Sequence, residues 1–256
     1  MAEFGIIADI AFAYELIVFV IYNVFLYFIY QRKKEKTTAL TKIVFNVFVG
    51  YSFGILFSAV SKMFNSVWGG VPYESVPENA LWLVARLHSG RFGFIGVIFG
   101  TIYSYELYLN VFKKEIPKLK MNLTKGFGYL IVLYLAIGYK FDKETGRAVQ
   151  SFEIVAFALL LLYLLIVYIP FMKSAFRLAD RIPVEEEGYK RAIKSLGYMA
   201  LSFIMIFSFF LIDRVMLLAF SWAYSTFYFL GWVFVLTAIY SAYSGYIKPA
   251  VKQREE

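Results

Sequence analysis

Five long stretches of this chain contain no Asp, Glu, Lys or Arg: residues 16–31, 43–61, 154–172, 195–212 and 215–247. A helix needs about 20 mainly apolar residues to cross the hydrocarbon core of a bilayer, so runs of this length predict membrane-spanning segments. The runs are continuously apolar and do not alternate with polar residues, which favours helices over the strands of a barrel. The chain is therefore predicted to be an all-α, multi-pass membrane protein.

The composition of the whole chain agrees with a membrane protein. Hydrophobic residues make up 61% of the sequence and charged residues 17%, whereas soluble domains average about half apolar and a quarter charged. We expect one seven-helix transmembrane domain over residues 1–256. Its helices are predicted near 5–31, 39–64, 81–111, 125–141, 151–178, 188–220 and 225–248.

The segments between these helices alternate in basic content, which predicts the orientation. Segments 31–38, 113–125 and 173–194 contain four, five and six Lys/Arg residues, and the tail after residue 247 contains three. The segments on the opposite side contain none, three and none. Because basic residues concentrate on the cytoplasmic side, we expect the N-terminus outside and the C-terminus in the cytoplasm of a cell-membrane protein. The concentration of basic residues on the cytoplasmic side then accounts for the net charge of +8. The expected partner is therefore the lipid bilayer, and no nucleic-acid partner is expected.

The fourth predicted helix is short for a membrane span. Only 14 residues separate Lys125 from Lys140, about 21 Å of helix against a core of about 30 Å. Lysine side chains that reach toward the interfaces would close this gap. If the segment did not cross, the basic segment 173–194 would face outward, so the charge distribution favours a crossing.

Two pairs of segments resemble each other across the chain and suggest an internal duplication. AYELIVF (13–19) is similar to SFEIVAF (151–157), and TIYSYE (101–106) is similar to AIYSAYS (238–244). This similarity predicts a three-plus-one-plus-three arrangement in which the fourth helix links two related halves. Chance similarity between apolar segments is the alternative.

The residue types exclude several kinds of chemistry. The chain has no cysteine and one histidine, so disulfides, thiolate nucleophiles, cysteine metal sites and bis-histidine haem sites are excluded. No nucleophile–base set is recognisable. We therefore predict that the protein is not an enzyme and holds no cofactor or metal.

The segment ARLHSGRFGF (85–94) places two arginines and the single histidine inside an apolar helix. Fourteen uncharged residues separate Arg91 from Glu106, about 22 Å along the axis, so the segment lies at the outer rim and not at the midplane. Other charges, including Lys62 and Glu153, are expected at the same level. The predicted ligand-binding residues in this layer are Glu15, Arg86, His88, Arg91, Asp213 and Arg214.

Two interpretations of this charged layer stay open. It is either a ring of ion pairs that fixes the helices, or a vestibule in which some charges bind a small anionic ligand from outside. In either case a buried Arg91 needs a carboxylate, and we expect Glu15 or Asp213 to supply it.

Two further patterns predict where helices pack closely and where the protein contacts a cytoplasmic partner. Small residues recur every three or four positions in two helices, at Gly50, Gly54 and Ser58 and from Ser89 to Ser104, which is typical of close helix packing in lipid. The segment RLADRIPVEEEGYKRAIKSLG (177–197) is highly charged, and we expect the fifth and sixth helices to project into the cytoplasm there and contact a protein.

Together these features predict a receptor or sensor module with an outward charged vestibule and a cytoplasmic output surface. A small-solute transporter or channel is the first alternative. An accessory or structural membrane subunit is the second.

The orientation can be tested with single cysteines, because the chain has none of its own. Glu74→Cys should react in sealed cells with a membrane-impermeant maleimide, whereas Glu186→Cys should not. Three predicted crossings separate these positions, so equal labelling of both would contradict the crossing of the fourth helix or the orientation itself.

Overall fold

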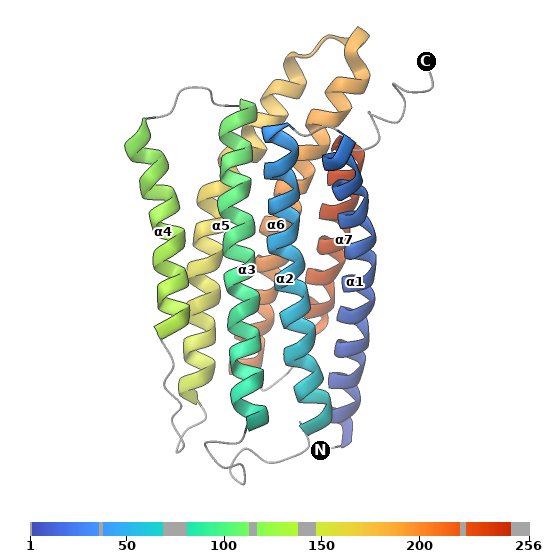
Figure 1. Ribbon diagram of the computed structural model, residues 1–256. Helices are drawn as coiled ribbons and strands as arrows, with labels where there is room; N and C mark the ends of the chain where they lie inside the picture. Colours follow the sequence, from blue (N-terminus) through green and yellow to red (C-terminus); the bar gives the residue numbers. More distant parts are fainter. Residues whose placement is uncertain are drawn as a thin grey trace.

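The computed structural model describes residues 2–35, 38–68, 81–112, 117–137, 147–220 and 224–246, and these ranges form an all-helical bundle (Figure 1). Seven α-helices and one short 3₁₀ helix lie in this part of the chain. Their bounds are α1 Ala2–Glu35, α2 Ala39–Trp68, α3 Leu81–Phe112, α4 Lys118–Ile137, α5 Arg147–Arg181, η2 Val184–Glu186, α6 Glu187–Phe220 and α7 Thr226–Tyr246.

The helices stand roughly parallel and alternate in direction. α1 begins at the lower end of Figure 1 and α7 ends at the upper end. Six of the described helices are long and apolar enough to cross a membrane, and α4 is not among them. The structure therefore supports the predicted helical bundle with several helices that could cross a membrane. The bounds agree with the predicted ones within a few residues except in α4, which begins seven residues earlier than expected, at Lys118.

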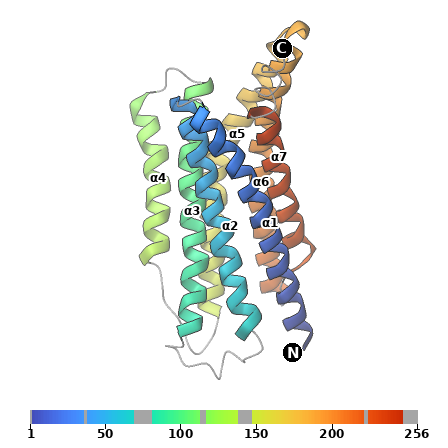
Figure 2. The same cartoon turned by 45° about the vertical axis from the view of Figure 1, so that its right-hand side comes forward.

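Sequence neighbours account for the most extensive contacts in the bundle. α2 packs against both α1 and α3, and α6 packs against both α5 and α7. Fewer contacts join α1 to α7 and α3 to α5, while α4 lies at the edge against α3 and α5 (Figure 2). The bundle thus consists of two three-helix groups that meet along two seams.

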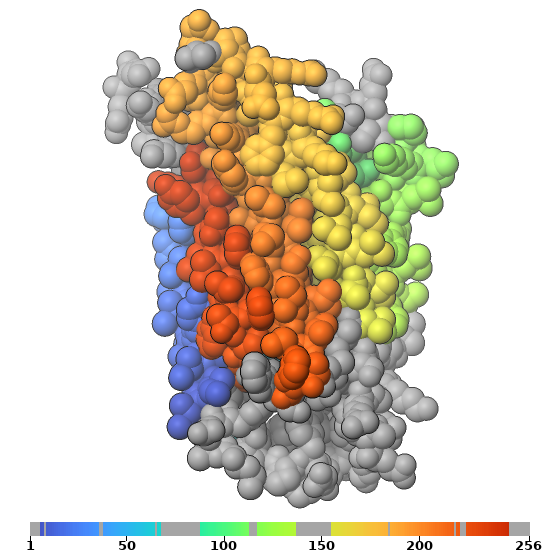
Figure 3. Space-filling view, turned by 180° about the vertical axis from the view of Figure 1, so that it is seen from behind, coloured from blue at the N-terminus to red at the C-terminus, as the bar shows by residue number. Residues whose placement is uncertain are grey.

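The α5–α6 hairpin extends beyond the ends of the other helices (Figures 1 and 3). It has a small hydrophobic cluster of its own, made of Ala175, Ala179, Ile182 and Ile193. The predicted projection is therefore present. Its location on the cytoplasmic side stays a prediction.

α2 and α3 approach so closely that glycine is required at their contact. A Cβ atom at Gly50 would lie 2.5 Å from the backbone nitrogen of Gly100. A Cβ atom at Gly96 would lie 2.9 Å from the Gly50 carbonyl oxygen. Neither backbone atom can move away as a flexible side chain would, so the predicted role of these small residues in packing is confirmed.

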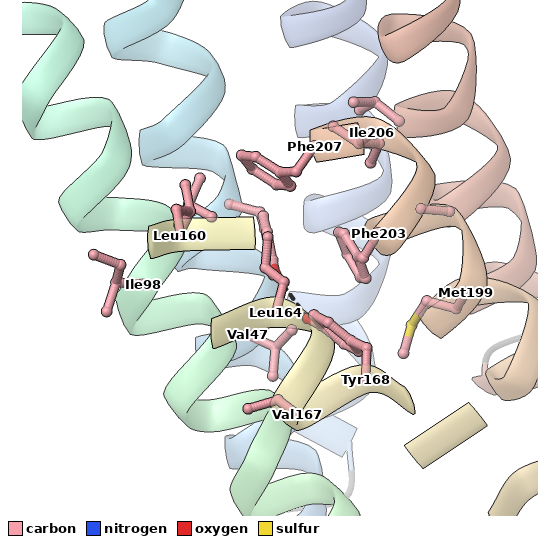
Figure 4. Packing of buried hydrophobic residues seen from close by; sticks show 14 of the residues in the cluster. Val47, Ile98, Leu160, Leu164, Val167, Tyr168, Met199, Phe203, Ile206 and Phe207 are labelled. Atoms are coloured by element: carbon pink, nitrogen blue, oxygen red, sulfur yellow. Dashed lines mark hydrogen bonds between the residues drawn. The ribbon is translucent and has the colours of Figure 1, made fainter. Parts of the chain in front are cut away.

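Aromatic rings with buried hydroxyl groups fill the middle of the bundle. The ring of Phe203 in α6 stacks on Tyr51 at 4.2 Å and on Tyr168 at 5.1 Å between centroids. Figure 4 shows Phe203 and Tyr168 facing each other from α6 and α5, with Leu160 and Leu164 nearby. These contacts join α2, α5 and α6 at mid-height.

The hydroxyl groups around these rings form one connected network. Thr101 donates to the Val97 carbonyl at 2.8 Å and Ser104 donates to the Gly100 carbonyl at 2.9 Å. Tyr168 donates to the Ser104 hydroxyl at 2.7 Å. Only the Tyr51 hydrogen then remains for two contacts of the Tyr51 oxygen, with Thr101 at 3.0 Å and with Tyr168 at 2.7 Å. This hydrogen must be shared, so the network has one more acceptor contact than it has hydrogens.

Two buried tyrosines allow the stabilisation from this network to be measured. Tyr168→Phe should lower the free energy of unfolding by about 1 kcal/mol, because it removes hydrogen bonds between helices. Tyr163→Phe is the matched control, because the Tyr163 hydroxyl is buried and makes no hydrogen bond with a described residue. Its removal should be neutral or stabilising in equilibrium unfolding in mixed micelles. Equal losses in the two variants would show that the network adds no stability.

Candidate functional site

A group of polar side chains surrounds Glu15 near the end of the bundle where α1 begins. Glu15 is completely buried, with 0% of its surface exposed, although it carries a carboxyl group inside a membrane-spanning helix. Its neighbours come from α2, from α6 and from α7 with the residues just before it. The Glu15 cluster consists of Glu15, Ser58, Lys62, Arg214, Tyr224, Tyr228 and Trp232.

The alternating direction of the helices brings these residues to one level. α1 and α7 begin at this end of the bundle, and α2 and α6 end there. Ser58 and Lys62 are four residues apart in α2, and Tyr228 and Trp232 are four residues apart in α7. Residues at this spacing lie one above the other on the same face of a helix, so each helix presents a pair to the cluster.

The Glu15 carboxylate accepts a hydrogen bond from Tyr228 and interacts with two positive charges. The Tyr228 hydroxyl donates a hydrogen bond to Oε1. Oε2 is buried and makes no hydrogen bond of normal geometry with a described residue, although the Ser58 hydroxyl lies close by. Lys62 and Arg214 act on the carboxylate as positive charges, and Lys62 has the larger effect of the two.

The Lys62 side chain is largely buried, and its ammonium group has no acceptor among the described residues. Only 7% of its surface is exposed, and it forms neither a hydrogen bond nor an ion pair with any residue that the structure describes. Its Nζ atom lies over the rings of Tyr224 and Tyr228, 4.8 Å and 5.4 Å from the centroids. A cation over two aromatic faces is stabilised by about 0.5–2 kcal/mol per contact, less than a full set of hydrogen bonds would give.

Asp213 fixes the turn that positions these rings. Its Oδ1 accepts hydrogen bonds from the Ser225 backbone nitrogen at 2.8 Å and from the Ser225 hydroxyl at 2.7 Å. The preceding residue, Tyr224, has a φ of 56°, a left-handed conformation that costs energy for a residue other than glycine. Its ring contacts the Tyr228 ring at 5.1 Å, which places both rings under the ammonium of Lys62.

Arg214 extends the layer toward the other side of the bundle. Its guanidinium group lies 5.7 Å from the centroid of the Phe157 ring in α5. Phe157 packs edge-to-face against Phe94 of α3 at 4.6 Å. A layer of interacting side chains at the height of the Glu15 cluster therefore extends from α1 through α6 to α5 and α3.

The structure brings together some of the predicted ligand-binding residues. Glu15 and Arg214 belong to the cluster, and Asp213 lies beside it as the acceptor for Ser225. His88 is exposed and Arg91 half-buried in the first half of α3. The Arg86 side chain lies outside the described residues, as does that of Glu153.

The predicted pairing of Arg91 with Glu15 or Asp213 stays a prediction, and the structure shows other residues bound to both carboxylates. Glu15 accepts from Tyr228 and interacts with Ser58, Lys62 and Arg214, while Asp213 accepts from Ser225. Both carboxylates are therefore engaged by other residues. The depth of these charges along the helices follows from spacing, but their rotation about each axis does not.

The sequence analysis did not identify Tyr224, Tyr228 or Trp232 as members of the site. Nothing in the sequence distinguishes Tyr228 from the other tyrosines, of which the chain has 21 in total. The one available signal was Lys62, a single base that ends a charge-free run of 19 residues, 43–61.

Comparisons with known proteins add no further assignment. No protein-family model, curated protein or solved structure matches the chain. Within the described ranges, no three His, Cys, Asp or Glu side chains are grouped so that they could hold a metal ion.

The hydrogen bond to Glu15 can be tested with two tyrosines of α7. Tyr228→Phe should lower the free energy of unfolding by about 1–3 kcal/mol, because it leaves a buried carboxylate without a donor. Tyr240→Phe is the control in the same helix, since 65% of that residue is exposed, and it should change stability by less than about 0.5 kcal/mol. Unfolding in mixed micelles measures both, and a Tyr228→Phe variant as stable as the control would contradict the proposed bond.

Proposed function

We propose that the protein is a seven-crossing receptor or sensor of the cell membrane, with its N-terminus outside and its C-terminus in the cytoplasm. The Glu15 cluster would bind a small anion from the outside. The α5–α6 hairpin, which covers the charged segment 177–197, would present the output to a cytoplasmic protein. The alternation of basic segments supports this orientation.

The crossing of α4 is supported by an ion pair with α3. Lys125 Nζ lies 2.5 Å from Glu106 Oε1, and both side chains are about three-quarters buried. Since Glu106 neutralises Lys125, the apolar length of α4 is bounded by Lys120 and Lys140 instead. The 17 residues of α4 that follow Lys120 span about 26 Å of helix, close to the thickness of the hydrocarbon core.

The two three-helix groups support the proposed duplication. α1–α2–α3 and α5–α6–α7 each have a central helix packed against both neighbours, with α4 at the edge. The Glu15 cluster lies where α1 and α2 of one group meet α6 and α7 of the other. A ligand there would contact both groups at once.

The Lys62 ammonium carries the proposed ligand chemistry, because the Lys62 side chain is largely buried and no described residue accepts a hydrogen bond from it. Burying a charge costs several kcal/mol unless hydrogen bonds or an opposite charge compensate it. Lys62 and Arg214 both act on Glu15 as positive charges, and neither forms a direct ion pair with Glu15 in the part of the chain that the structure describes. An anion would give the Lys62 ammonium the hydrogen-bond acceptors that the described residues do not supply.

A single continuous helix connects this site to the proposed output surface. α6 begins at Glu187 in the hairpin and carries Arg214 near its other end. About 40 Å of helix rise separates the two residues. A shift of α6 at the cluster would therefore move the hairpin, as rigid helices do in known switching proteins.

Anion binding should raise thermal stability, because a ligand that binds only the folded protein stabilises it by mass action, by about 2.7 kcal/mol at a hundred times its Kd. Acetate, sulfate and phosphate would be tested in detergent at fixed ionic strength, with chloride as the reference. Lys62→Gln should abolish the rise in melting temperature.

The matched control is Lys42→Gln, because Lys42 is an exposed lysine at the opposite end of α2. This variant should keep the full response to the anion. No stabilisation by any of the three anions, or an equal loss in the two variants, would contradict the proposed site. Time-dependent uptake of the stabilising anion into proteoliposomes would assign transport instead of sensing.

A further inference from the structure

We propose that the Glu15 cluster binds its anion together with one proton, which Glu15 takes up. This inference rests on the proposed anion site and names the second ligand of that site. Its basis is the position of Glu15 Oε2, a buried carboxylate oxygen that accepts no hydrogen bond of normal geometry from a described residue, near the buried side chain of Lys62, whose ammonium lies over two tyrosine rings.

Charge balance is the first argument. Lys62 is the strongest positive influence on Glu15, so the two groups lie close enough to interact although they form no direct ion pair. An anion that accepts hydrogen bonds from Lys62 is therefore brought close to the Glu15 carboxylate. Two negative charges in a buried region repel strongly, because little water screens them. One proton removes this repulsion.

Among the described residues around Glu15, no other charged or titratable group could offset the negative charge of the anion. From its own helix the neighbour is Tyr14, from α2 Lys62, and from α6 Arg214 together with Asp213, which is engaged by Ser225. The start of α7 contributes the neutral hydroxyl of Tyr228, with Tyr224 just before it. The two bases balance Glu15 and Asp213 without the anion, so the anion adds an uncompensated charge.

Hydrogen-bond complementarity is the second argument. A carboxylate only accepts hydrogen bonds, whereas a protonated carboxyl group also donates one. Tyr228 already donates to Oε1, so the added proton belongs on Oε2 and can be donated to the anion. The buried indole N–H of Trp232, which makes no hydrogen bond of normal geometry with a described residue, is a further donor at the same site.

The proton balance of this step is simple. One proton leaves bulk water or buffer and forms an O–H bond on Glu15 when the anion binds. No other covalent bond forms or breaks. The cluster therefore recognises an anion plus a proton, which for a monovalent anion such as acetate together equal a weak acid in its neutral form.

Calorimetry of the full-length protein measures the proton directly. Sulfate and acetate would be titrated between about pH 6 and about pH 8, where neither changes its charge, in buffers of different ionisation enthalpy. We expect uptake of about one proton per anion. The Kd should rise by about tenfold for each unit of increasing pH.

Glu15→Gln separates the proton from the anion. Glutamine has the same shape and no charge, so this variant should bind the anion with no proton uptake and with a Kd that does not depend on pH. Tyr228→Phe, which keeps the carboxyl group, should still take up the proton. Infrared difference spectra provide a measurement on the unmodified protein, in which the anion should produce the C=O band of a protonated carboxylic acid.

Each result distinguishes this inference from the function on which it rests. Anion binding without proton uptake, or without the carboxylic-acid band, would overturn the inference and leave the anion site intact. Uptake that persists in Glu15→Gln would also overturn it, because another group would then carry the proton. Failure of both anions to bind would overturn the proposed function, and the inference with it.

Discussion

Hydrocarbon offers no hydrogen-bond partner, and this constraint determines where polar groups occur in the protein. Many large hydrophobic side chains are exposed on the bundle, and some buried hydroxyl groups, such as that of Tyr168, bond to another helix. At mid-height the partners are neutral, as in the Tyr51–Tyr168–Ser104 chain. Full charges occur nearer the ends, where Lys125 pairs with Glu106 and Glu15 accepts from Tyr228.

Properties of a single helix could be predicted from the sequence. A charge-free run must lie in lipid or core whatever its neighbours are, and the five such runs predicted α1, α2, α5, α6 and α7 near their observed positions. The close contact of α2 with α3 could also be predicted, because Gly50 and Gly96 leave room that another helix must fill. The start of α4 was misplaced because Lys125 was taken as the end of the apolar segment, whereas Glu106 of another helix neutralises it.

The partners within the candidate site could not be predicted in the same way. Spacing along a helix gives the depth of a charge, and that depth was sufficient to place Glu15, Lys62 and Arg214 in one layer. A choice between partners also requires the rotation of each helix and the path of the chain before α7. Tyr224 and Ser225 determine that path through a positive φ and through bonds to Asp213, and neither leaves a pattern in the sequence.

The interaction between Glu15 and Lys62 bears on whether the cluster is purely structural. A buried ion pair adds little stability even when its geometry is good, and apolar residues of similar size often stabilise a core more. Here the geometry is not that of a closed pair, because the ammonium lies over two tyrosine rings and one carboxylate oxygen accepts no hydrogen bond of normal geometry from a described residue. One of those rings, that of Tyr224, is positioned by a left-handed backbone conformation next to Ser225, which Asp213 holds by hydrogen bonds. An arrangement that keeps two opposite charges apart at the cost of backbone strain stabilises the fold less than direct contact would, which favours the proposed ligand site over a purely structural role.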